Sequence, residues 1–354
     1  MTRLASAARV LVRRRAIVIL ALAAGCLVAA PSAQARLTAS AVFPVCIEMG
    51  GQAGPDVAGT VVVWTDNRNG ELDIYGRDLS KSGDFAVCAA AGSQDNPAVA
   101  AVTTGSRTQY SAIWVDKRNH DGGDIYGRNL TTRRSFVVAR SATLKWFPEI
   151  CGPWAAWIEA DDSAGPYTIR ARDLAAGKTY KIATSTVLSS FGLTRRTVDG
   201  AGVYTAVYAS SGGDISGRDL PDGPPFNVSR SDAFEWSPDI SADRVVWWED
   251  GERIWLRNLK ARTRTLVGTG SRPRVDGELV VWDGGGHGGG FVTDYVDGAA
   301  ISVRNVAHGT NAIRIRQAHL TCLFPAVSGA TVVWESGPAR RVLSHIHIYG
   351  ASVR

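Results

Sequence analysis

The chain repeats one pattern of residues seven times. Its clearest copy runs from Pro55 to Leu79 and reads PDVAGTVVVWTDNRNGELDIYGRDL, and the copy from Pro97 to Leu130 keeps PAVA, AIWVDKRN and GDIYGRNL. The remaining copies open at Pro148, Val198, Pro238, Pro273 and Pro325. Units that repeat in this way stack side by side, because each one buries its apolar face only against its neighbours. The repeat therefore constrains the fold more than any other feature.

Each unit contains the signals of four short β-strands. In the first unit they are expected at 56–58, 61–64, 73–79 and 85–88, where Val, Ile, Tyr, Phe and Trp dominate and Gly, Asp, Asn and Ser separate the runs. The opening proline suits the first residue of a strand, where its missing N–H is harmless. No long stretch after residue 35 has helical periodicity. These features predict an all-β fold.

The length of the unit predicts a β-propeller. Residues 55–354 divide into seven units of about 43 residues, the span of a four-stranded propeller blade. The fourth copy is degenerate, with Val198 in place of the proline and Tyr208 in place of a tryptophan that recurs in the second strand of the others. We therefore predict seven blades of four antiparallel strands in one domain over 36–354, with six blades as the alternative. The recurring tryptophans are Trp64, Trp114, Trp157, Trp247, Trp282 and Trp334.

The two ends of the chain complement each other. The last copy stops at HIYGASVR, which is a third strand, so its fourth strand is missing. The segment 41–47 contains FPVC at 43–46, which matches the fourth strand of the first unit, FAVC at 85–88. We expect 41–47 to complete the last blade and to close the ring, which leaves no unpaired edge at the seam.

Four cysteines follow residue 35, at Cys46, Cys88, Cys151 and Cys322. An even count in an exported protein permits two disulfides, with three possible connectivities. Cys46 is placed where a bond to Cys322 would staple the closed ring. Isolated buried thiols are the alternative.

The first 35 residues have the features of a secretory signal peptide. Arg3, Arg9 and 13–15 form a basic region, 16–30 is apolar, and AQA at 33–35 is a small-x-small cleavage site. The arginine run also fits a twin-arginine signal, and Cys26 lies in a weak match to a lipoprotein acylation box. We expect an exported protein, extracellular or held in the periplasm or cell envelope, with lipid anchoring at Cys26 left open.

Removal of this segment changes the charge balance. The whole chain has a formal charge of +6, but the segment holds five arginines and no acidic residue, so 34 basic residues face 33 acidic ones after it. This near-neutral balance removes the main argument for a nucleic-acid partner, because nucleic-acid binding needs a clustered basic footprint. No second apolar stretch is long enough to cross a membrane as a helix. The expected partner is a protein or an envelope polysaccharide, and the chain itself is expected to be a monomer.

The pattern PxxxG…VVWxD…DIYGRDL resembles the TolB-like β-propeller repeats of secreted and cell-surface bacterial proteins. The resemblance covers the chain from about Phe43 to Arg354 and implies a binding propeller without catalytic activity. TolB itself has an additional N-terminal α/β domain, and 35–43 leaves no room for one. The resemblance therefore does not imply membership of the Tol system.

The residues that recur in every copy are expected to build the blades. An Asp or Asn in DIYGRDL and its copies enters a hairpin, where its side chain bonds turn backbone. Arg77 and its equivalents are expected to pair with acids on adjacent blades. The tryptophans are expected to pack between blades, although such rings also line sugar sites. The hairpin residues are Asp78, Asn129, Asp173, Asp219, Asn258 and Asn305.

The residues that the copies do not share indicate a binding surface. In a propeller, the loops between second and third strands and the connections between units emerge on one face, here named the loop face. Its loops are long, charged and variable, and aromatic residues precede several units. This mixture is typical of recognition surfaces, although the aromatics would also fit as plugs between blades. The candidate binding residues are Asp66, Arg68, Asp116, Arg118, Trp146, Trp236 and Phe324.

No motif for catalysis occurs. The sequence lacks GxSxG, HExxH and phosphate-binding glycine loops. His345 and His347 share one face of a strand but lack a third ligand for catalytic zinc, and no calcium-loop spacing occurs, although Asp161 and Asp162 leave Ca²⁺ open. We predict no catalytic residue, cofactor or metal, and hence a non-catalytic binding or scaffold module of the cell envelope. The alternative is a propeller enzyme on carbohydrates, a polysaccharide lyase or a glycosidase.

Overall fold

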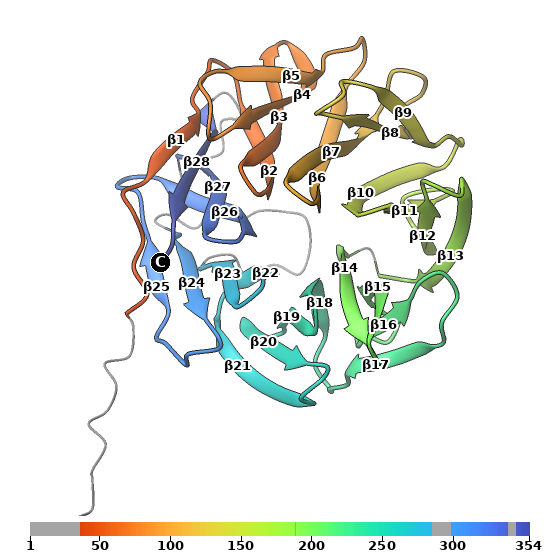
Figure 1. The fold of residues 1–354 in the computed structure, drawn as a ribbon, viewed down its shortest axis with the longest axis vertical. Coiled ribbons are helices and arrows are strands. Elements are labelled where there is room, and N and C mark those ends of the chain that lie inside the picture. Colours follow the sequence, from red (N-terminus) through yellow and green to blue (C-terminus); the bar gives the residue numbers. More distant parts are fainter. Residues whose placement is uncertain (1–35, 188, 285–298, 339–344) are drawn as a thin grey trace, which may run out of the picture. The chain divides into compact units, whose positions relative to one another are not determined.

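The computed structural model describes residues 36–187, 189–284, 299–338 and 345–354. These residues contain 28 β-strands in seven four-stranded antiparallel sheets, which are arranged as the blades of a ring (Figure 1). The prediction of a seven-bladed propeller is confirmed, and the six-bladed alternative is wrong. The predicted signal peptide, with Cys26, lies outside the described residues.

The strands follow one another from the innermost to the outermost strand of each blade. Blades 1 and 2 are β2 (Gln52–Ala58), β3 (Val61–Asn69), β4 (Glu71–Asp78), β5 (Asp84–Cys88), and β6 (Gln94–Thr104), β7 (Arg107–Asp116), β8 (Asp124–Asn129), β9 (Ser135–Ala139). Blades 3 and 4 are β10 (Leu144–Cys151), β11 (Trp154–Ala160), β12 (Tyr167–Asp173), β13 (Lys178–Ser185), and β14 (Phe191–Val198), β15 (Ala201–Ala209), β16 (Ile215–Asp219), β17 (Pro225–Ser229). Blades 5 and 6 are β18 (Glu235–Ser241), β19 (Arg244–Glu249), β20 (Arg253–Asn258), β21 (Thr263–Thr269), and β22 (Ser271–Asp276), β23 (Leu279–Asp283), β24 (Ile301–Asn305), β25 (Ile313–Ile315). The described residues form no helix that is long and apolar enough to cross a membrane.

Blade 7 is built from both ends of the chain. Its strands are β26 (Thr321–Ser328), β27 (Thr331–Gly337), β28 (His347–Ser352) and, outermost, β1 (Phe43–Cys46). β1 pairs with β28 in antiparallel register, with Phe43 opposite Gly350. An isolated bridge between Ala39 and Val353 extends this pairing. The predicted closure of the ring by the N-terminal segment is confirmed.

The tryptophans of the second strands pack between blades, as predicted. Trp64 is fully buried in a cluster that includes Val45 of blade 7. Because side chains two positions apart share one face of a strand, the indoles of Trp64, Trp114 and Trp157 also reach an acid two residues on. Trp64 Nε1 donates to Asp66 at 2.9 Å, and Trp114 Nε1 donates to Asp116 at 2.9 Å. The Trp-x-Asp spacing thus pairs a donor that burial would otherwise leave unsatisfied.

The innermost strands of six blades carry a β-bulge at the opening proline. The register of β2 against β3 shifts between Ala53 and Asp56, and that of β10 against β11 shifts between Trp146 and Glu149. Bulges redirect side chains and are frequent beside functional sites. Here the bulged residues line a central channel. They have positive φ and are Gly54, Asn96, Phe147, Ser237, Arg272 and Phe324.

Blade 4 lacks both the proline and the bulge. β14 begins at Phe191 and pairs with β15 without a register shift, and Val198 is its last residue. The prediction that this blade opens at Val198 is therefore wrong, because the proline signal that marks the other blades is missing here. Tyr208 is buried opposite Phe191, in the position that tryptophan occupies elsewhere.

The arginines of the third strands join neighbouring blades, but not by the predicted ion pairs. Arg77 Nη1 donates to the carbonyl of Val45 at 2.8 Å, and Arg128 Nη1 donates to the carbonyl of Val87 at 2.9 Å. Arg218 and Arg304 make the same kind of bond to the preceding blade. Each acceptor is the carbonyl of a bulged residue in an outermost strand, which the strand pairing of its own blade skips. The arginine satisfies this carbonyl.

The predicted hairpin role holds for five of the six Asp and Asn residues. The side chain of Asp78, for example, accepts a bond from the Ser80 backbone N–H at 3.1 Å. Asp219 differs, because it accepts bonds from Thr205 at 2.6 Å and from Arg196 at 3.0 Å instead. The residues that bond turn backbone are Asp78, Asn129, Asp173, Asn258 and Asn305.

The four cysteines of the described chain are free thiols, so the predicted disulfides do not form. Cys46 lies in the outermost strand of blade 7 and Cys322 in its innermost strand, with β28 and β27 between them. Three strand spacings amount to about 14 Å, whereas a disulfide needs Cα atoms within about 7 Å. Cys88 and Cys151 lie in blades 1 and 3, which blade 2 separates. Burial raises the pKa of Cys46 to about 12, which keeps this thiol protonated.

Candidate functional site

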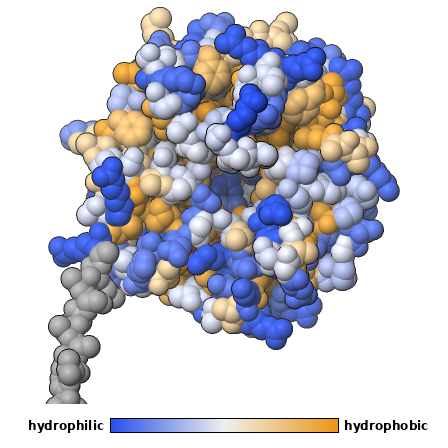
Figure 2. Space-filling view, in the orientation of Figure 1, coloured by the Kyte–Doolittle hydropathy of each residue, from blue (hydrophilic) through white to orange (hydrophobic). Residues whose placement is uncertain are grey.

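A central channel lies between the innermost strands. Its cavity has a volume of about 640 Å³ and is lined by residues of β2, β6, β10, β14, β18, β22 and β26. Figure 2 shows one face of the molecule hollowed at its centre, with hydrophilic surface inside the hollow. The volume falls within the range of about 300–1,000 Å³ that is typical of small-ligand sites. The channel is therefore the candidate site.

Aromatic side chains surround the channel at its loop-face end, here named the mouth. Phe147 and Phe324 precede the opening prolines of blades 3 and 7, and Trp236 pairs with Trp248 across β18 and β19. The ring centroids of Trp236 and Trp248 are 6.3 Å apart, and the Arg272 guanidinium lies over Phe324 at 4.4 Å. Of the predicted aromatic residues, the structure brings Trp236 and Phe324 to the channel.

Two indole N–H groups at the mouth are buried without a partner. Nε1 of Trp236 and Nε1 of Trp248 make no hydrogen bond within the described residues. The Trp248 residue is only 8% exposed. A buried donor that stays unpaired costs about 1–3 kcal/mol, so native proteins nearly always give such a group a partner. A ligand with hydrogen-bond acceptors would supply that partner here.

Deeper in the channel, one ring of equivalent positions carries the charged side chains. Each of the charged positions follows the opening proline of its blade. The remaining three blades place small residues there, Ala98, Gly192 and Ala326. The propeller thus assembles a charged ring from residues that are far apart in the chain. The four charged residues of this ring are Asp56, Glu149, Asp239 and Arg274.

Two of these four residues hold adjacent blades together. Asp56 Oδ2 accepts the backbone N–H of Val99 at 2.7 Å, and Asp239 Oδ2 accepts that of Val275 at 2.8 Å. Each bond runs from one innermost strand to the next. These carboxylates therefore have a structural role. Glu149 and Arg274, by contrast, form no hydrogen bond or ion pair among the described residues.

The environment of the ring shifts the pKa values of its members. Burial raises the pKa of Glu149 to about 8 and that of Asp56 to about 6, and it also raises the pKa of Asp239, although the Arg274 charge opposes all three shifts. Burial works against the charge of Arg274, but the three carboxyls outweigh it and raise its pKa. All four side chains keep some contact with water through the channel. At neutral pH Glu149 is therefore protonated and Arg274 is charged.

We expect Glu149→Gln to stabilise the protein at high pH and to leave its stability unchanged at low pH. A carboxyl whose pKa rises from 4.5 to about 8 on folding binds its proton more tightly in the folded state. Stability is therefore lost as the pH rises through this window, and the neutral glutamine amide removes the loss. Thermal unfolding at pH 4 and pH 9 tests this prediction. An equal change of Tm at both pH values would contradict it.

The predicted polar residues of blade 1 form a buried ion pair away from the channel. Asp66 is fully buried and accepts bonds from Trp64 Nε1 at 2.9 Å and from Arg68 Nη2 at 2.6 Å. Arg68 lies over the ring of Tyr75 at 4.1 Å and reaches Asp84 of the outermost strand β5 at 3.3 Å. Asp66 is thus a structural acceptor, and Arg68 links the second strand of blade 1 to its fourth.

Blade 2 repeats this arrangement with Asp116 and Arg118. Arg118 Nη2 pairs with Asp116 at 2.6 Å and lies over the ring of Tyr126 at 4.5 Å. In blade 3, Trp146 of β10 packs edge-on against Tyr167 of β12, with ring centroids 5.9 Å apart. None of these residues is among the described residues that line the channel. The predicted set therefore divides between the channel and the blade interiors.

Sequence reasoning did not identify the charged ring or Trp248. The signal for the ring was present, because the position after the opening proline changes between Asp, Ala, Glu and Arg while its neighbours repeat. Trp248 directly follows the recurring Trp247. Neighbouring residues of a strand point to opposite faces, so Trp248 occupies the other side of the strand from the recurring tryptophan.

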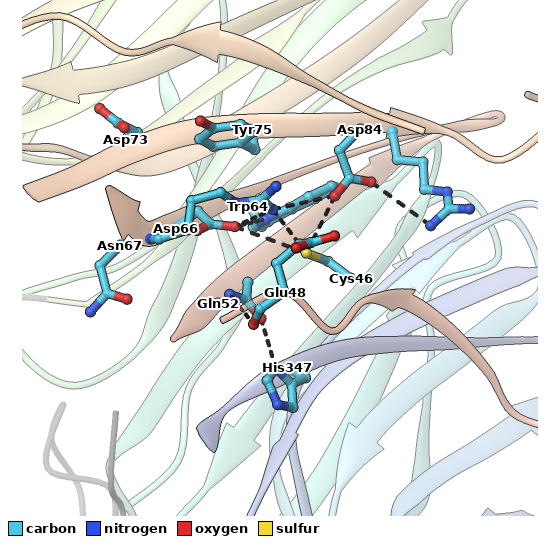
Figure 3. Close-up of polar contacts among 12 residues, drawn as sticks. Cys46, Glu48, Gln52, Trp64, Asp66, Asn67, Asp73, Tyr75, Asp84 and His347 are labelled. Carbon is cyan, nitrogen blue, oxygen red and sulfur yellow. Dashed lines mark hydrogen bonds and ion pairs between the residues drawn. The ribbon is translucent and has the colours of Figure 1, made fainter. Parts of the chain in front are cut away.

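His347 forms a contact between the last and first blades. Its Nδ1 lies 2.7 Å from Oε1 of Gln52 (Figure 3). Burial, followed by the neighbouring His345, lowers the pKa of His347, so its imidazole is neutral at pH 7. The described residues hold no group of three or more His, Cys, Asp and Glu placed to bind a metal ion. The geometry supports a hydrogen bond that joins β28 to β2.

Comparisons with known proteins concern the fold. No family model matches the chain, and no curated protein matches it. An oligogalacturonate lyase from Vibrio parahaemolyticus matches with a TM-score of 0.61 and 12% identity, over 90% of this chain and 96% of the lyase. An acylaminoacyl peptidase from Pyrococcus horikoshii matches with a TM-score of 0.57 and 9% identity, over 86% of this chain and 52% of the peptidase. TolB from Acinetobacter baumannii matches with a TM-score of 0.49 and 14% identity, over 75% of this chain and 63% of TolB. At these identities the chain is a β-propeller that is distantly similar in fold to lyase and peptidase propellers.

Proposed function

We propose that this protein is an exported, non-catalytic propeller that binds the end of an envelope polysaccharide at the mouth of its channel. The observation that carries the proposal is the pair Trp236 and Trp248, whose unpaired N–H groups lie beside a cavity of about 640 Å³. Export is inferred from the sequence of residues 1–35.

The chemistry of the mouth suits a saccharide. Sugars offer C–H faces that pack on aromatic rings and oxygen atoms that accept hydrogen bonds, and tryptophan supplies both an apolar ring and a polar N–H. Phe234 is 48% exposed and stacks on Trp236 with ring centroids 5.6 Å apart. The aromatic surface thus continues from the channel onto the loop face, as an extended chain would require.

A saccharide accounts for the site better than a protein partner does. A stable protein interface buries about 800 Å² on each partner, which would need binding groups spread over the loop face. The polar candidates of the loop face in blades 1 and 2 are already engaged in ion pairs inside their blades. Two of the buried side-chain donors without a partner, Nε1 of Trp236 and Nε1 of Trp248, lie instead at the concave mouth.

Titration calorimetry of residues 36–354 against envelope-type oligosaccharides tests this function. We expect Trp236→Ala to weaken binding at least about tenfold, equivalent to 1.4 kcal/mol, because it removes both the ring and the N–H. Trp236→Phe keeps an aromatic ring without the N–H, so its affinity should lie between that of the wild type and that of Trp236→Ala. Trp255→Phe is the matched control, because Trp255 belongs to the same blade but lies outside the channel lining.

The outcomes separate the proposed partners. Binding that survives Trp236→Ala unchanged would place the site elsewhere and contradict the proposal. Capture of an envelope protein by the wild type in the absence of any saccharide binding would favour a protein partner instead. Release of shortened saccharides during the titration would show that the protein is an enzyme.

The last outcome corresponds to a second candidate function, a carbohydrate-active enzyme. The observation in its favour is that two carboxyls of one channel, Asp56 and Glu149, have pKa values of about 6 and about 8. Carboxyl groups with separated pKa values are how many enzymes divide the roles of base and acid. Turnover of any saccharide that Glu149→Gln abolishes would establish this alternative.

A further inference from the structure

We infer that the channel contains a binding site for one anionic group, a carboxylate or a sulfate, held between Arg274 and Glu149. This site lies deeper than the aromatic mouth and would accept the charged end of a ligand that enters there. The inference extends the proposed function, but it rests on different residues and can be tested without any saccharide.

Arg274 is the first element of the site. Its guanidinium lines the channel and forms no hydrogen bond or ion pair among the described residues. Arg272, which also lines the channel, is already occupied, because it donates to Asp283 at 2.7 Å and 3.1 Å. A guanidinium offers five N–H donors in a planar fork that matches carboxylate and sulfate oxygens. Arg274 is thus a preformed anion-binding group with its donors unused.

The neighbouring carboxyls do not fill this role for Arg274. Asp56 and Asp239 each give one oxygen to a backbone N–H of the next blade. Neither forms an ion pair with Arg274 in the described structure. The electrostatic attraction of these two carboxyls stabilises the charge of Arg274 without occupying its hydrogen-bond donors. An entering anion would therefore not have to displace a bound carboxylate.

Glu149 supplies the second donor. Its carboxyl has no hydrogen-bond partner among the described residues, and burial raises its pKa to about 8, so it carries a proton at neutral pH. A protonated carboxyl donates one O–H bond. It joins Arg274, Trp236 Nε1 and Trp248 Nε1 as a donor without a partner along this channel. Such a lining selects a ligand that is rich in acceptors.

The charges that face Glu149 determine how binding depends on pH. Arg274, Asp56 and Asp239 face it from β22, β2 and β18, and Cys151 follows on its own strand. The pKa of Asp56, at about 6, is also raised by burial. Deprotonation of either carboxyl adds negative charge beside the anion, and deprotonation of Glu149 also removes a donor. Anion affinity should therefore fall as the pH rises from 6 to 9.

The test is calorimetric titration of residues 36–354 with sodium sulfate, with D-glucuronate and with D-glucose as the neutral control, at pH 6, 7 and 9 and constant ionic strength. We expect both anions to bind at pH 6 and to lose at least about tenfold in affinity by pH 9, which corresponds to 1.4 kcal/mol. Arg274→Gln should lose at least about tenfold at pH 6. Glu149→Gln should retain binding and flatten the dependence between pH 7 and pH 9.

Arg244→Gln is the control for charge removal, because Arg244 lies outside the channel lining and pairs weakly with Glu278 at 3.8 Å. Its affinity should equal that of the wild type. If Arg274→Gln does not fold, the Tm of the wild type still decides, because sulfate should raise it more at pH 6 than at pH 9. An affinity that rises with pH, or equal binding of glucose and glucuronate, would overturn the inference.

The two proposals fail in different ways. Sulfate binding that depends on Arg274, without any saccharide binding, would leave the anion site standing and remove the proposed function. If neutral oligosaccharides bind in a way that depends on Trp236 but not on Arg274, and sulfate does not bind, the proposed function stands and the anion site is ruled out.

Discussion

Replacement of Trp64 by alanine should lower the free energy of unfolding by about 3–5 kcal/mol, the usual loss for removal of a large buried aromatic side chain. Trp64 is fully buried where blade 7 meets blade 1, in one cluster with Val45 and Ile348. The substitution also removes the indole N–H that donates a hydrogen bond to Asp66 at 2.9 Å. The loss should therefore lie at the upper end of this range.

Trp64→Phe separates the two contributions. Phenylalanine fills most of the volume but leaves the fully buried Asp66 without its indole donor, although Arg68 still pairs with it at 2.6 Å. We expect an intermediate loss. Trp255→Ala serves as the matched control, because Trp255 is only half-buried. Urea unfolding followed by intrinsic fluorescence measures all three, and a loss below about 1 kcal/mol for Trp64→Ala would contradict the packing role.

Removal of residues 36–47 should prevent the ring from closing. The deletion takes away β1, which pairs with β28, and with it the fully buried Val45. It also removes the Val45 carbonyl that Arg77 contacts at 2.8 Å. β28 would then become an exposed edge strand, and such edges pair with other chains. We expect aggregation, or a much lower Tm with loss of the single cooperative transition.

Size-exclusion chromatography and thermal unfolding measure this effect. A deletion of 36–40 is the control, because it removes the short pairing around Ala39 but keeps β1. That variant should stay monomeric with a small loss of Tm. When a synthetic peptide that spans 36–49 is added to the variant that lacks 36–47, it should bind as the missing strand and restore the folded ring. A monomeric long deletion with unchanged Tm would show that β1 is dispensable.

The blade architecture could be predicted because its determinants are local and repeated. Proline, the Trp-x-Asp spacing and DIYGRDL mark strand starts, buried faces and hairpins without reference to distant residues. The orphan FPVC segment matched FAVC closely enough to predict the closure. Prediction failed where the local signal was missing, as at β14, or where the partner was a backbone atom of another blade, as for Arg77.

The candidate site was only half accessible to sequence reasoning. Trp236 and Phe324 were predicted from their position before the units, and the structure places both at the channel. Asp66 and Arg68 were predicted as surface residues of the loop face, but a charged side chain two residues after a buried tryptophan shares its buried face. The strand alternation that places Asp66 against Trp64 therefore makes its carboxylate a partner of the indole.

The sequence by itself determined that this chain is a ring of seven blades, because each unit carries its own strand signals and only its neighbours can cover its apolar face. The tertiary structure alone decided what the ring encloses. Asp56, Glu149, Asp239 and Arg274 come from four different blades, and their charges interact only once the innermost strands surround one channel. Burial in that channel, which no single repeat can produce, is what raises the pKa of Glu149 to about 8 and leaves the donors of Arg274 available for a ligand.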